Sequence, residues 1–285
     1  MTRKNYVTGT MGWKRCHLVH IFCALLLVGF FVVHLWIYEQ QLEEQINVMN
    51  WTGEKTTLVT MAYNSKRRGN WKVMLESYCR MDDIFDKILF IWQNVSAPCP
   101  EFQPCEVDVQ CLATKQNSMN NRYYFREHVQ TRTTFSVDDD VLVPRDLVIK
   151  LLRRSFQSDL VGLDTRSFGS DGTYSFWGFT YPNKMVLPKT WVLPVRYWDL
   201  YWQDEQILRF IDSGNACEDL AMNFVVRNYT QENPAFVYSS FFGQQRQVLK
   251  EAGGLSIIGD RWNWGDRRTF CVSWLLQHFP LALVE

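Results

Sequence analysis

Three consecutive aspartates, Asp138, Asp139 and Asp140, follow the short apolar stretch TTFSV. Adjacent carboxylates repel one another and aspartate is rare in strands, so a cluster at the end of a predicted strand favours a bound cation. In an extended chain Asp138 and Asp140 would face one ion, and Asp139 would face a ribose or sugar hydroxyl. Carboxylate oxygens suit Mn²⁺ or Mg²⁺, with open positions for substrate phosphates. The alternative is a solvated acidic turn that caps the following helix.

A second acidic pair begins the segment EDLAMNFVV, which reads as a helix over residues 218–228. Acidic residues are ordinary in a first helical turn because they complement the helix dipole. The catalytic interpretation makes Asp219 the carboxylate that contacts an acceptor hydroxyl or the reacting face of a sugar. Further along, DRWNWGDRRTFC offers rings that could stack on sugars and arginines that could neutralise a leaving diphosphate. These residues are Trp262, Trp264, Arg267 and Arg268.

Amide and guanidinium donors follow two other predicted strands. Such donors can hold a uracil edge or a pyrophosphate. A strand that leads into a helix, here expected to open at Asn64 and Ser65, is also a natural anion site. Solvated loops and common helix caps are the alternatives. The candidate donors are Asn64, Arg67, Asn117, Asn121 and Arg122.

Histidine chemistry has little support in this chain. Of five histidines, His17, His20 and His34 lie in or beside an apolar N-terminal segment. Only His128 and His278 remain, and neither belongs to a motif typical of Ser-His-Asp or Cys-His catalysis. Carboxylates and a metal are therefore the favoured chemistry.

The elements that must position these residues alternate between strand and helix from residue 56 onward. Apolar stretches TLVTMAY, KILFIW, VDVQCLAT and TTFSV read as strands, with a helical pattern over 71–78. This order predicts a layered α/β domain with a mostly parallel sheet. Further helices are expected over 147–156 and 218–228. No repeat or second boundary appears, so residues 56–285 are treated as one domain.

The N-terminus carries the pattern of a membrane anchor. No Asp, Glu, Lys or Arg occurs from Cys16 to Tyr38, which as a helix would span roughly 35 Å and cross a bilayer core of about 30 Å. Basic residues precede this stretch and glutamates follow it, which places the N-terminus in the cytosol. We expect a cytosolic tail over 1–16, a signal anchor over 17–38 and a stem over 39–55. A buried core helix is the alternative.

A lumenal compartment is consistent with the cysteines. Of eight, Cys16 and Cys23 lie in the apolar segment and the other six follow it, where disulfides are permitted. Their pairing is not determined by sequence. A zinc site is disfavoured because no C-x2-C pair occurs. With 30 basic and 30 acidic residues, no net charge favours nucleic acid, and an anionic ligand needs a local site.

Taken in order, several motifs resemble the transferase domain of the exostosin and exostosin-like glycosyltransferases, the GT64-type domain. They are TLVTMAYNS, KILFIWQN, KQNSMNNR, SVDDDVLV, CEDLAMNF and RRTFC, and they cover about residues 56–280. The resemblance implies a GT-A fold, which joins a Rossmann-like nucleotide half to an acceptor half. It also implies retaining transfer from a UDP-sugar with Mn²⁺. Together with the anchor and lumenal domain predicted above, we expect a single-pass type II protein of the Golgi or endoplasmic reticulum membrane.

The resemblance assigns roles by position. Asp138, Asp139 and Asp140 match the metal and donor motif, with Asp140 as a direct metal ligand beside Asp138. Asp219 matches the proposed catalytic carboxylate and Arg268 an arginine near the diphosphate. The nucleotide- and sugar-contacting positions are Asn117 and Arg122, and the implied disulfide joins Cys217 to Cys271.

Two positions depart from the family pattern. After Trp92 the family has two asparagines, whereas this chain has Gln93 and Asn94. Asn94 remains a candidate nucleotide contact, and because it also lies in a glycosylation sequon we predict that it is unmodified. Where the family can place an arginine, this chain has Ser65, with Arg67 or Arg68 as substitutes.

Substrates follow from the resemblance only as classes. Animal relatives transfer N-acetylhexosamine to proteoglycan linkers or heparan chains, which predicts UDP-GlcNAc or UDP-GalNAc as donor and a glycan acceptor. Plant relatives act on glycosylated sphingolipids, so a glycolipid acceptor is the alternative. A catalytically silent sugar-binding partner is a further alternative that the intact aspartates disfavour. Homo- or hetero-oligomers are compatible with each of these hypotheses.

Overall fold

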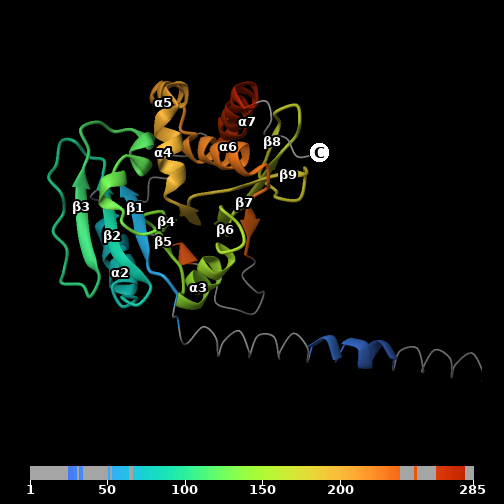
Figure 1. Cartoon of the computed structure of the whole chain (residues 1–285), viewed down its shortest axis with the longest axis horizontal. Helices are drawn as coiled ribbons and strands as arrows, with labels where there is room; N and C mark the ends of the chain where they lie inside the picture. The colour runs from blue at the N-terminus through green and yellow to red at the C-terminus, as the bar shows by residue number, and fades with distance from the viewer. Residues whose placement is uncertain are drawn as a thin grey trace, which may run out of the picture. The chain divides into compact units, whose positions relative to one another are not determined.

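The computed structural model describes residues 25–30, 32–34, 51, 53–63, 67–237, 247–248 and 261–279. The chain divides into two compact units, Met1–Asn50 and Trp51–Glu285. Figure 1 shows the elements of the second unit, which contains the predicted strands and helices.

In the first unit, residues 25–30 and 32–34 are helical and their large apolar side chains are exposed. The predicted tail over 1–16, most of the predicted anchor over 17–38 and most of the stem over 39–55 lie outside the described residues. Among the helices that the structure does describe, none is both long and apolar enough to cross a membrane.

A seven-stranded sheet forms the centre of the second unit. Its strand order is β11-β6-β10-β4-β1-β2-β3. Strand β10 is antiparallel to both of its neighbours, and the remaining pairings within this sheet are parallel. The strands are β1 Thr56–Ala62, β2 Phe85–Trp92, β3 Asp108–Ala113, β4 Thr133–Val137, β6 Val161–Gly162, β10 Thr190–Pro194 and β11 Ala235–Phe236.

Strands β1 and β10 are buried along almost their whole length, whereas the edge strand β3 is half-exposed. Both faces of the central strands are covered, one of them by the helix α2, Arg68–Tyr78, as expected for a mostly parallel sheet. Successive side chains of a strand point to opposite faces. On β2, Phe90 and Trp92 pack against Trp71 of the helix α2, while Leu89 and Ile91 join the main core on the other face. The predicted α/β domain with a mostly parallel sheet is confirmed.

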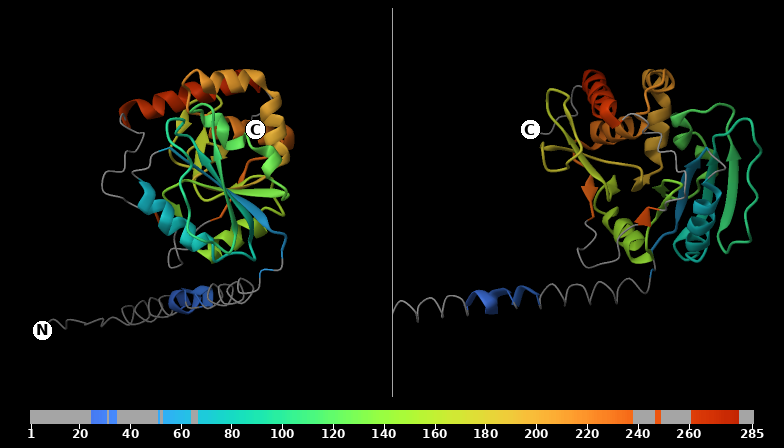
Figure 2. Two further views of the ribbon diagram at one scale, coloured as in Figure 1. Left: turned by 90° about the vertical axis from the view of Figure 1, so that its left-hand side faces the viewer. Right: turned by 180° about the vertical axis from the view of Figure 1, so that it is seen from behind.

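The helices are arranged around this sheet in space, as Figures 1 and 2 show. The predicted helices at 71–78, 147–156 and 218–228 are all present, within a few residues at their ends. The bounds are α2 Arg68–Tyr78, α3 Arg145–Arg154, α4 Arg196–Gln203, α5 Glu205–Asp212, α6 Glu218–Thr230 and α7 Arg261–His278, with short 3₁₀ helices η2 Met119–Tyr123 and η3 Arg126–His128.

Two smaller sheets complete the unit. Strand β5, Val141–Leu142, directly follows the aspartate triplet and pairs with β12, Gln247–Val248, in antiparallel orientation. Strand β7 Thr165–Phe168 lies between β8 Tyr174–Ser175 and β9 Asn183–Val186, antiparallel to both. This three-stranded sheet contacts α7 through β8.

Three disulfides resolve the pairing that the sequence left open. They join Cys79 to Cys105, Cys99 to Cys111, and Cys217 to Cys271. The last is the pair that the family resemblance implied. The first two tie α2 and β3 to the connection between β2 and β3.

Helix α2 also holds the segment after the aspartate triplet. The buried Tyr78 hydroxyl accepts the Val143 N–H at 2.9 Å and donates to the Val141 carbonyl at 3.4 Å. Tyr78 therefore fixes β5 against α2 and limits where the preceding turn can lie.

Replacing Tyr78 with Phe should destabilise the fold, because it leaves the buried Val143 N–H without its acceptor. The expected cost is about 1–3 kcal/mol of unfolding free energy, measured by chemical denaturation. The exposed Tyr124 offers a matched control, since Tyr124→Phe should change stability little. Equal midpoints for wild type and Tyr78→Phe would show that the hydroxyl does not support this segment.

Candidate active site

The aspartate triplet forms a turn at the carboxyl end of β4. Asp139 and Asp140 lie in the turn, which the Val141 N–H closes by donating to the Asp138 carbonyl at 3.1 Å. The extended geometry expected from the sequence is wrong, because the chain reverses to begin β5 at Val141. Alternation of side chains therefore does not set the directions of these carboxylates.

Asp139 is the buried member of the triplet. Its carboxylate accepts from Arg67 Nη1 at 2.7 Å and from Trp71 Nε1 at 3.2 Å. Burial raises its pKa, and the charge of Arg67 and the bond from Trp71 oppose that rise. Its two oxygens each accept one bond, from Arg67 and from Trp71, and its contact with a sugar hydroxyl stays a prediction. Asp139 thereby anchors the turn.

Arg122 connects the triplet to the acidic start of α6. Its Nη2 lies 3.4 Å from Asp138 Oδ1, and its Nε lies 3.5 Å from Glu218 Oε1. The guanidinium is buried, and among the described residues its Nη1 has no hydrogen-bond acceptor. The two acidic segments, far apart in the sequence, thus share one buried cation with hydrogen-bonding capacity to spare.

Glu218 is a site residue that sequence reasoning missed. It is buried beside Asp219 at the start of α6. Burial raises its pKa to about 7, the neighbouring Asp219 charge adds to the rise, and Arg122 opposes it. The acidic first turn of α6 marked both Glu218 and Asp219 as candidates. The helical periodicity of the sequence did not show that Glu218 faces the interior.

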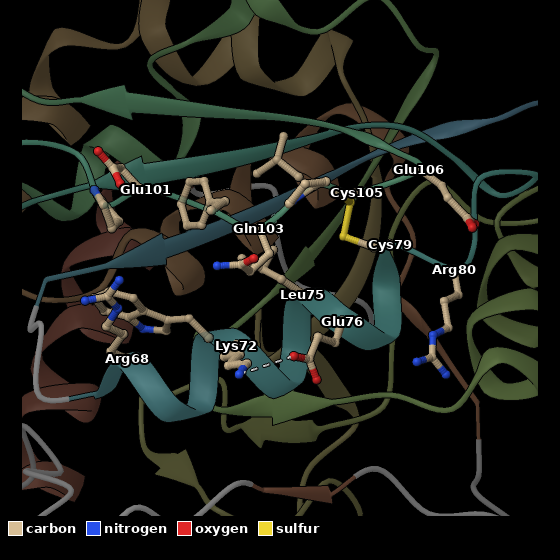
Figure 3. Close-up of a pocket in the computed structure, with 15 residues that line it drawn as sticks. Arg68, Lys72, Leu75, Glu76, Cys79, Arg80, Glu101, Gln103, Cys105 and Glu106 are labelled. Atoms are coloured by element: carbon tan, nitrogen blue, oxygen red, sulfur yellow. Dashed lines mark ion pairs between the residues drawn. A yellow bond between two sulfur atoms is a disulfide. The ribbon is translucent and has the colours of Figure 1, made fainter.

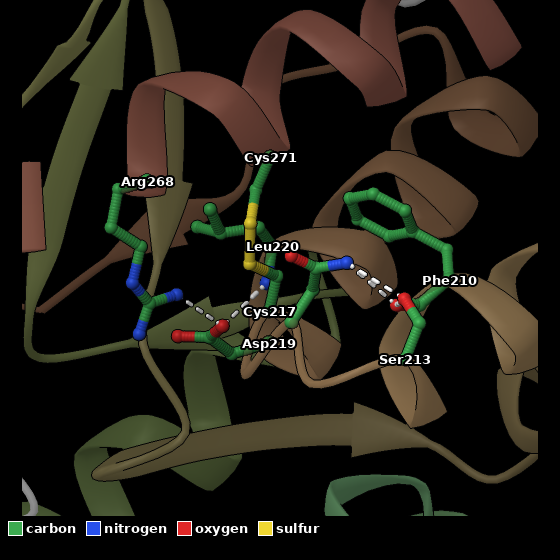
Figure 4. Close-up of a disulfide and its surroundings, with 8 residues drawn as sticks. Phe210, Ser213, Cys217, Asp219, Leu220, Arg268 and Cys271 are labelled. Carbon is green, nitrogen blue, oxygen red and sulfur yellow. Dashed lines mark hydrogen bonds and ion pairs between the residues drawn. A yellow bond between two sulfur atoms is a disulfide. The ribbon is translucent and has the colours of Figure 1, made fainter. Parts of the chain in front are cut away.

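Asp219 and Arg268 form an ion pair between α6 and α7. Arg268 Nη1 donates to Asp219 Oδ1, which also accepts the Leu220 N–H at 2.8 Å (Figure 4). The Cys217–Cys271 disulfide lies directly beside this pair and crosslinks the same two helices. The Arg268 guanidinium lies 4.6 Å from the Trp264 ring centroid. The crosslink therefore fixes the parts of α6 and α7 that carry Asp219 and Arg268 next to each other.

The predicted nucleotide-binding amides differ in their surroundings. Asn121 is buried and donates to Gln93 Oε1 and to the Gln116 carbonyl, both at 2.8 Å. These bonds brace the loop after β3, so the Asn121 amide is committed to the protein. Asn117 is exposed on the same loop.

The remaining predicted contacts lie after β1 and β2. Asn94 is half-buried, and its side-chain oxygen accepts the Ser96 N–H at 3.1 Å, which shapes its own turn. Asn64 and Ser65 lie outside the described residues, and α2 begins at Arg68 instead of at those positions.

The triplet offers two carboxylates to a cation. The side chains of Asp138 and Asp140 are each 28% exposed, and burial followed by the Asp138 charge raises the pKa of Asp140. Within the described part of the chain no three Asp, Glu, His or Cys side chains converge as a closed metal site. Two half-exposed hard oxygen donors suit a Mn²⁺ or Mg²⁺ ion that takes its other ligands from phosphates and water, so the residues fit such an ion.

A cavity of about 480 Å³ lies apart from this site, between α2 and the segment 100–106 (Figure 3). Trp71 is common to both: its indole N–H donates to Asp139, and it also lines the cavity. The cavity wall also contains Arg68, but none of the paired carboxylates and arginines of the site. The candidate chemistry thus lies at the carboxyl end of β4.

The structure is that of an α/β domain whose sheet carries a cluster of carboxylates and arginines at one strand end. The chain belongs to glycosyl transferase family 64, since the domain of that family matches residues 56–284. The predicted membership in the exostosin-like group, and with it the class of glycosyltransferases, is confirmed at the level of the family.

The curated relatives include plant inositolphosphorylceramide transferases and an animal exostosin-like protein. Glucosamine inositolphosphorylceramide transferase 1 from Arabidopsis thaliana is 32% identical over 74% of this chain and 32% of its own length. Exostosin-like 2 from Mus musculus is 26% identical over 78% of this chain and 71% of its length. Glycosylinositol phosphorylceramide mannosyl transferase 1 from A. thaliana is 28% identical over 61% of this chain and 54% of its own length. The chain thus spans about a third of the first relative.

Glu218 should make the stability of this domain depend on pH. Its carboxyl has a folded-state pKa of about 7 against an ordinary value of 4.5, so it binds a proton on folding between these values. Wild type therefore loses stability as pH rises through that window. The Glu218→Gln side chain does not ionise in this range. The melting temperature of the variant minus that of wild type should therefore increase from pH 5 to pH 8.

Glu205→Gln is the matched control, because Glu205 is an exposed carboxyl paired with Arg209 on α5. Its effect should be small at each pH. Parallel melting profiles for Glu218→Gln and wild type from pH 5 to pH 8 would contradict the assignment of a raised pKa to Glu218.

Proposed function

We propose that the chain is a retaining glycosyltransferase of GT-A type that uses a UDP-sugar and Mn²⁺ or Mg²⁺. One observation carries the proposal: buried Arg122 contacts both Asp138 of the triplet and Glu218 beside Asp219. A donor-binding motif and a catalytic motif of the family thereby form one charged site.

In this proposal Asp140, with Asp138, holds the divalent cation against the donor diphosphate. The bound cation would offset the negative charge that grows on the departing diphosphate. Arg122 is buried and has an unused N–H at Nη1, and its positive charge would help to offset the charge of the diphosphate. Asn117, exposed on the loop after β3, and Asn94 would contact the nucleotide from neighbouring strand ends.

Transfer would take place beside Asp219. The bond between the anomeric carbon and the diphosphate oxygen breaks, and a bond to the acceptor oxygen forms on the same face, as retention requires. The acceptor hydroxyl proton passes to the departing diphosphate. Asp219 would orient that hydroxyl or stabilise the positive charge at the anomeric carbon, and Arg268, which holds Asp219, would also neutralise the diphosphate.

The substrate classes are part of the proposal. We favour UDP-GlcNAc or UDP-GalNAc as donor. A glycan acceptor such as a proteoglycan linker or heparan chain agrees with the exostosin-like relative, and a glycosylated sphingolipid agrees with the inositolphosphorylceramide transferases. The identity of 32% with one of the latter is the specific observation that favours the lipid alternative. A Golgi or endoplasmic reticulum membrane, with this domain in the lumen, is the proposed location.

Hydrolysis of a panel of UDP- and GDP-sugars by residues 50–285 tests donor, metal and activity together. We expect release of UDP from an N-acetylhexosamine donor, its loss with EDTA and its recovery with added Mn²⁺. Release that is equal in EDTA would contradict the metal site. A folded protein that binds the nucleotide sugar and hydrolyses none of the panel would indicate the silent sugar-binding alternative.

Asp140→Asn and Asp219→Asn should each lower transfer or donor hydrolysis by a factor of at least about 100, because each removes charge needed at the reacting centre. Circular dichroism should show a retained fold. Asp86→Asn, at an exposed position on β2, is the control and should retain activity. Near-normal turnover of either site variant would refute the role assigned to that residue.

A further inference from the structure

An exposed aromatic loop lies beside the Asp219–Arg268 pair. This aromatic loop, residues 174–182 with the sequence YSFWGFTYP, joins β8 to β9 and contains no charged residue. Phe176 is 46%, Trp177 65% and Phe179 81% exposed. Large apolar rings displayed together on a surface indicate a contact with a partner or a membrane.

The loop is ordered by its own hydrogen bonds. The buried Ser167 hydroxyl donates to the Trp177 carbonyl at 2.6 Å and accepts the Tyr181 N–H at 3.2 Å. Ser175 Oγ accepts the Trp177 N–H at 3.1 Å and donates to Thr180 Oγ1 at 2.8 Å. The exposed rings are therefore held outward by a fixed backbone.

Gly178 allows this arrangement. A Cβ at that position would lie 2.4 Å from Thr165 Oγ1, so only glycine lets the loop cross β7 so closely. The neighbours on each side, Trp177 and Phe179, have ring centroids 5.9 Å apart. The pair forms an exposed apolar tip.

The base of the loop is attached to the candidate active site. The Tyr174 N–H donates at 3.2 Å to Thr269 Oγ1, next to Arg268 on α7. The Phe176 ring lies against Gly265 of the same helix, where an added Cβ would be 3.5 Å from it. Whatever the tip contacts is therefore held at the edge of the Asp219 site.

We infer that the aromatic loop inserts Trp177 and Phe179 into the interfacial region of a lipid bilayer. Phenylalanine and tryptophan bury favourably at the boundary between headgroups and acyl chains. A sugar platform is less suitable, because the loop contains no charged group and the Ser175 hydroxyl donates to Thr180. A tip of two rings is also small for a stable protein interface.

The length of chain before the domain keeps a bilayer within reach. Residues 39–55 separate the predicted anchor from β1 and span at most about 60 Å when fully extended. Insertion of the loop would place the Asp219 site against acceptors presented at the membrane surface. The inference rests on the exposed rings and stands independently of the proposed transferase activity.

Brominated lipids test the inference, because bromine on the acyl chains quenches tryptophan only at close range. The full chain is reconstituted in phosphatidylcholine nanodiscs with and without bromine, as wild type and as Trp177→Phe. Subtracting the variant spectrum isolates Trp177 from the other tryptophans, and Phe preserves an apolar ring. We expect brominated lipid to reduce the Trp177 emission, and neutral lipid to suffice because the loop carries no charge.

Two further variants make the test specific. Phe179→Ser should weaken quenching of Trp177, since burial of one such ring contributes about tenfold in binding. Phe156→Ser, at an exposed phenylalanine after α3, should not change it. Trp177 emission that is equal in both lipids overturns the inference, whether the loop then proves to contact a glycan or a second copy of the chain.

The readout is separate from catalysis. Trp177 and Phe179 are outside the residues assigned to donor and acceptor chemistry, so both variants should retain Mn²⁺-dependent hydrolysis of the nucleotide sugar. Quenching without any hydrolysis would leave the membrane contact in place and remove the transferase proposal. Hydrolysis without quenching would support the transferase proposal and overturn the membrane contact.

Discussion

The arrangement of this domain depends on one buried cation. Arg122 has to be balanced by carboxylates because an unpaired charge in the interior is unstable, and it finds Asp138 on one side and Glu218 on the other. The turn after β4 and the start of α6 are thereby drawn to the same place. A guanidinium can do this because its several N–H groups diverge, whereas a lysine offers a single charged centre.

Similar pairings surround that centre and have different consequences. Arg67 and Trp71 bind Asp139, which makes that residue an anchor for the turn and leaves Asp138 and Asp140 half-exposed. Arg268 binds Asp219 while a disulfide joins the two helices that carry them. Glu218, deeply buried, has a raised pKa. The carboxylates of this cluster thus differ in their depth and in the closeness of their partners.

The same helix that carries Arg268 also holds the aromatic loop, through Thr269 and Gly265. Hydrogen bonds within the loop and to Ser167 of β7 fix its backbone, and the Trp177 and Phe179 rings are exposed. The charged site and the apolar tip are therefore attached to one rigid element. Such an arrangement couples the position of the Asp219–Arg268 pair to whatever surface the tip contacts.

The sequence determined much of this protein by itself. Apolar runs and helical periodicity predicted the α/β layers and the strand before the aspartates, and ordered motifs predicted the family and the Cys217–Cys271 pair. Tertiary structure decided the directions of side chains: the turn at Asp138 to Asp140, the inward face of Glu218, the commitment of Asn121 to Gln93 and the pairing of the other four cysteines. Local patterns fix which segments are helix or strand, but partners distant in sequence fix which polar groups are buried, because only the folded chain supplies their counter-charges.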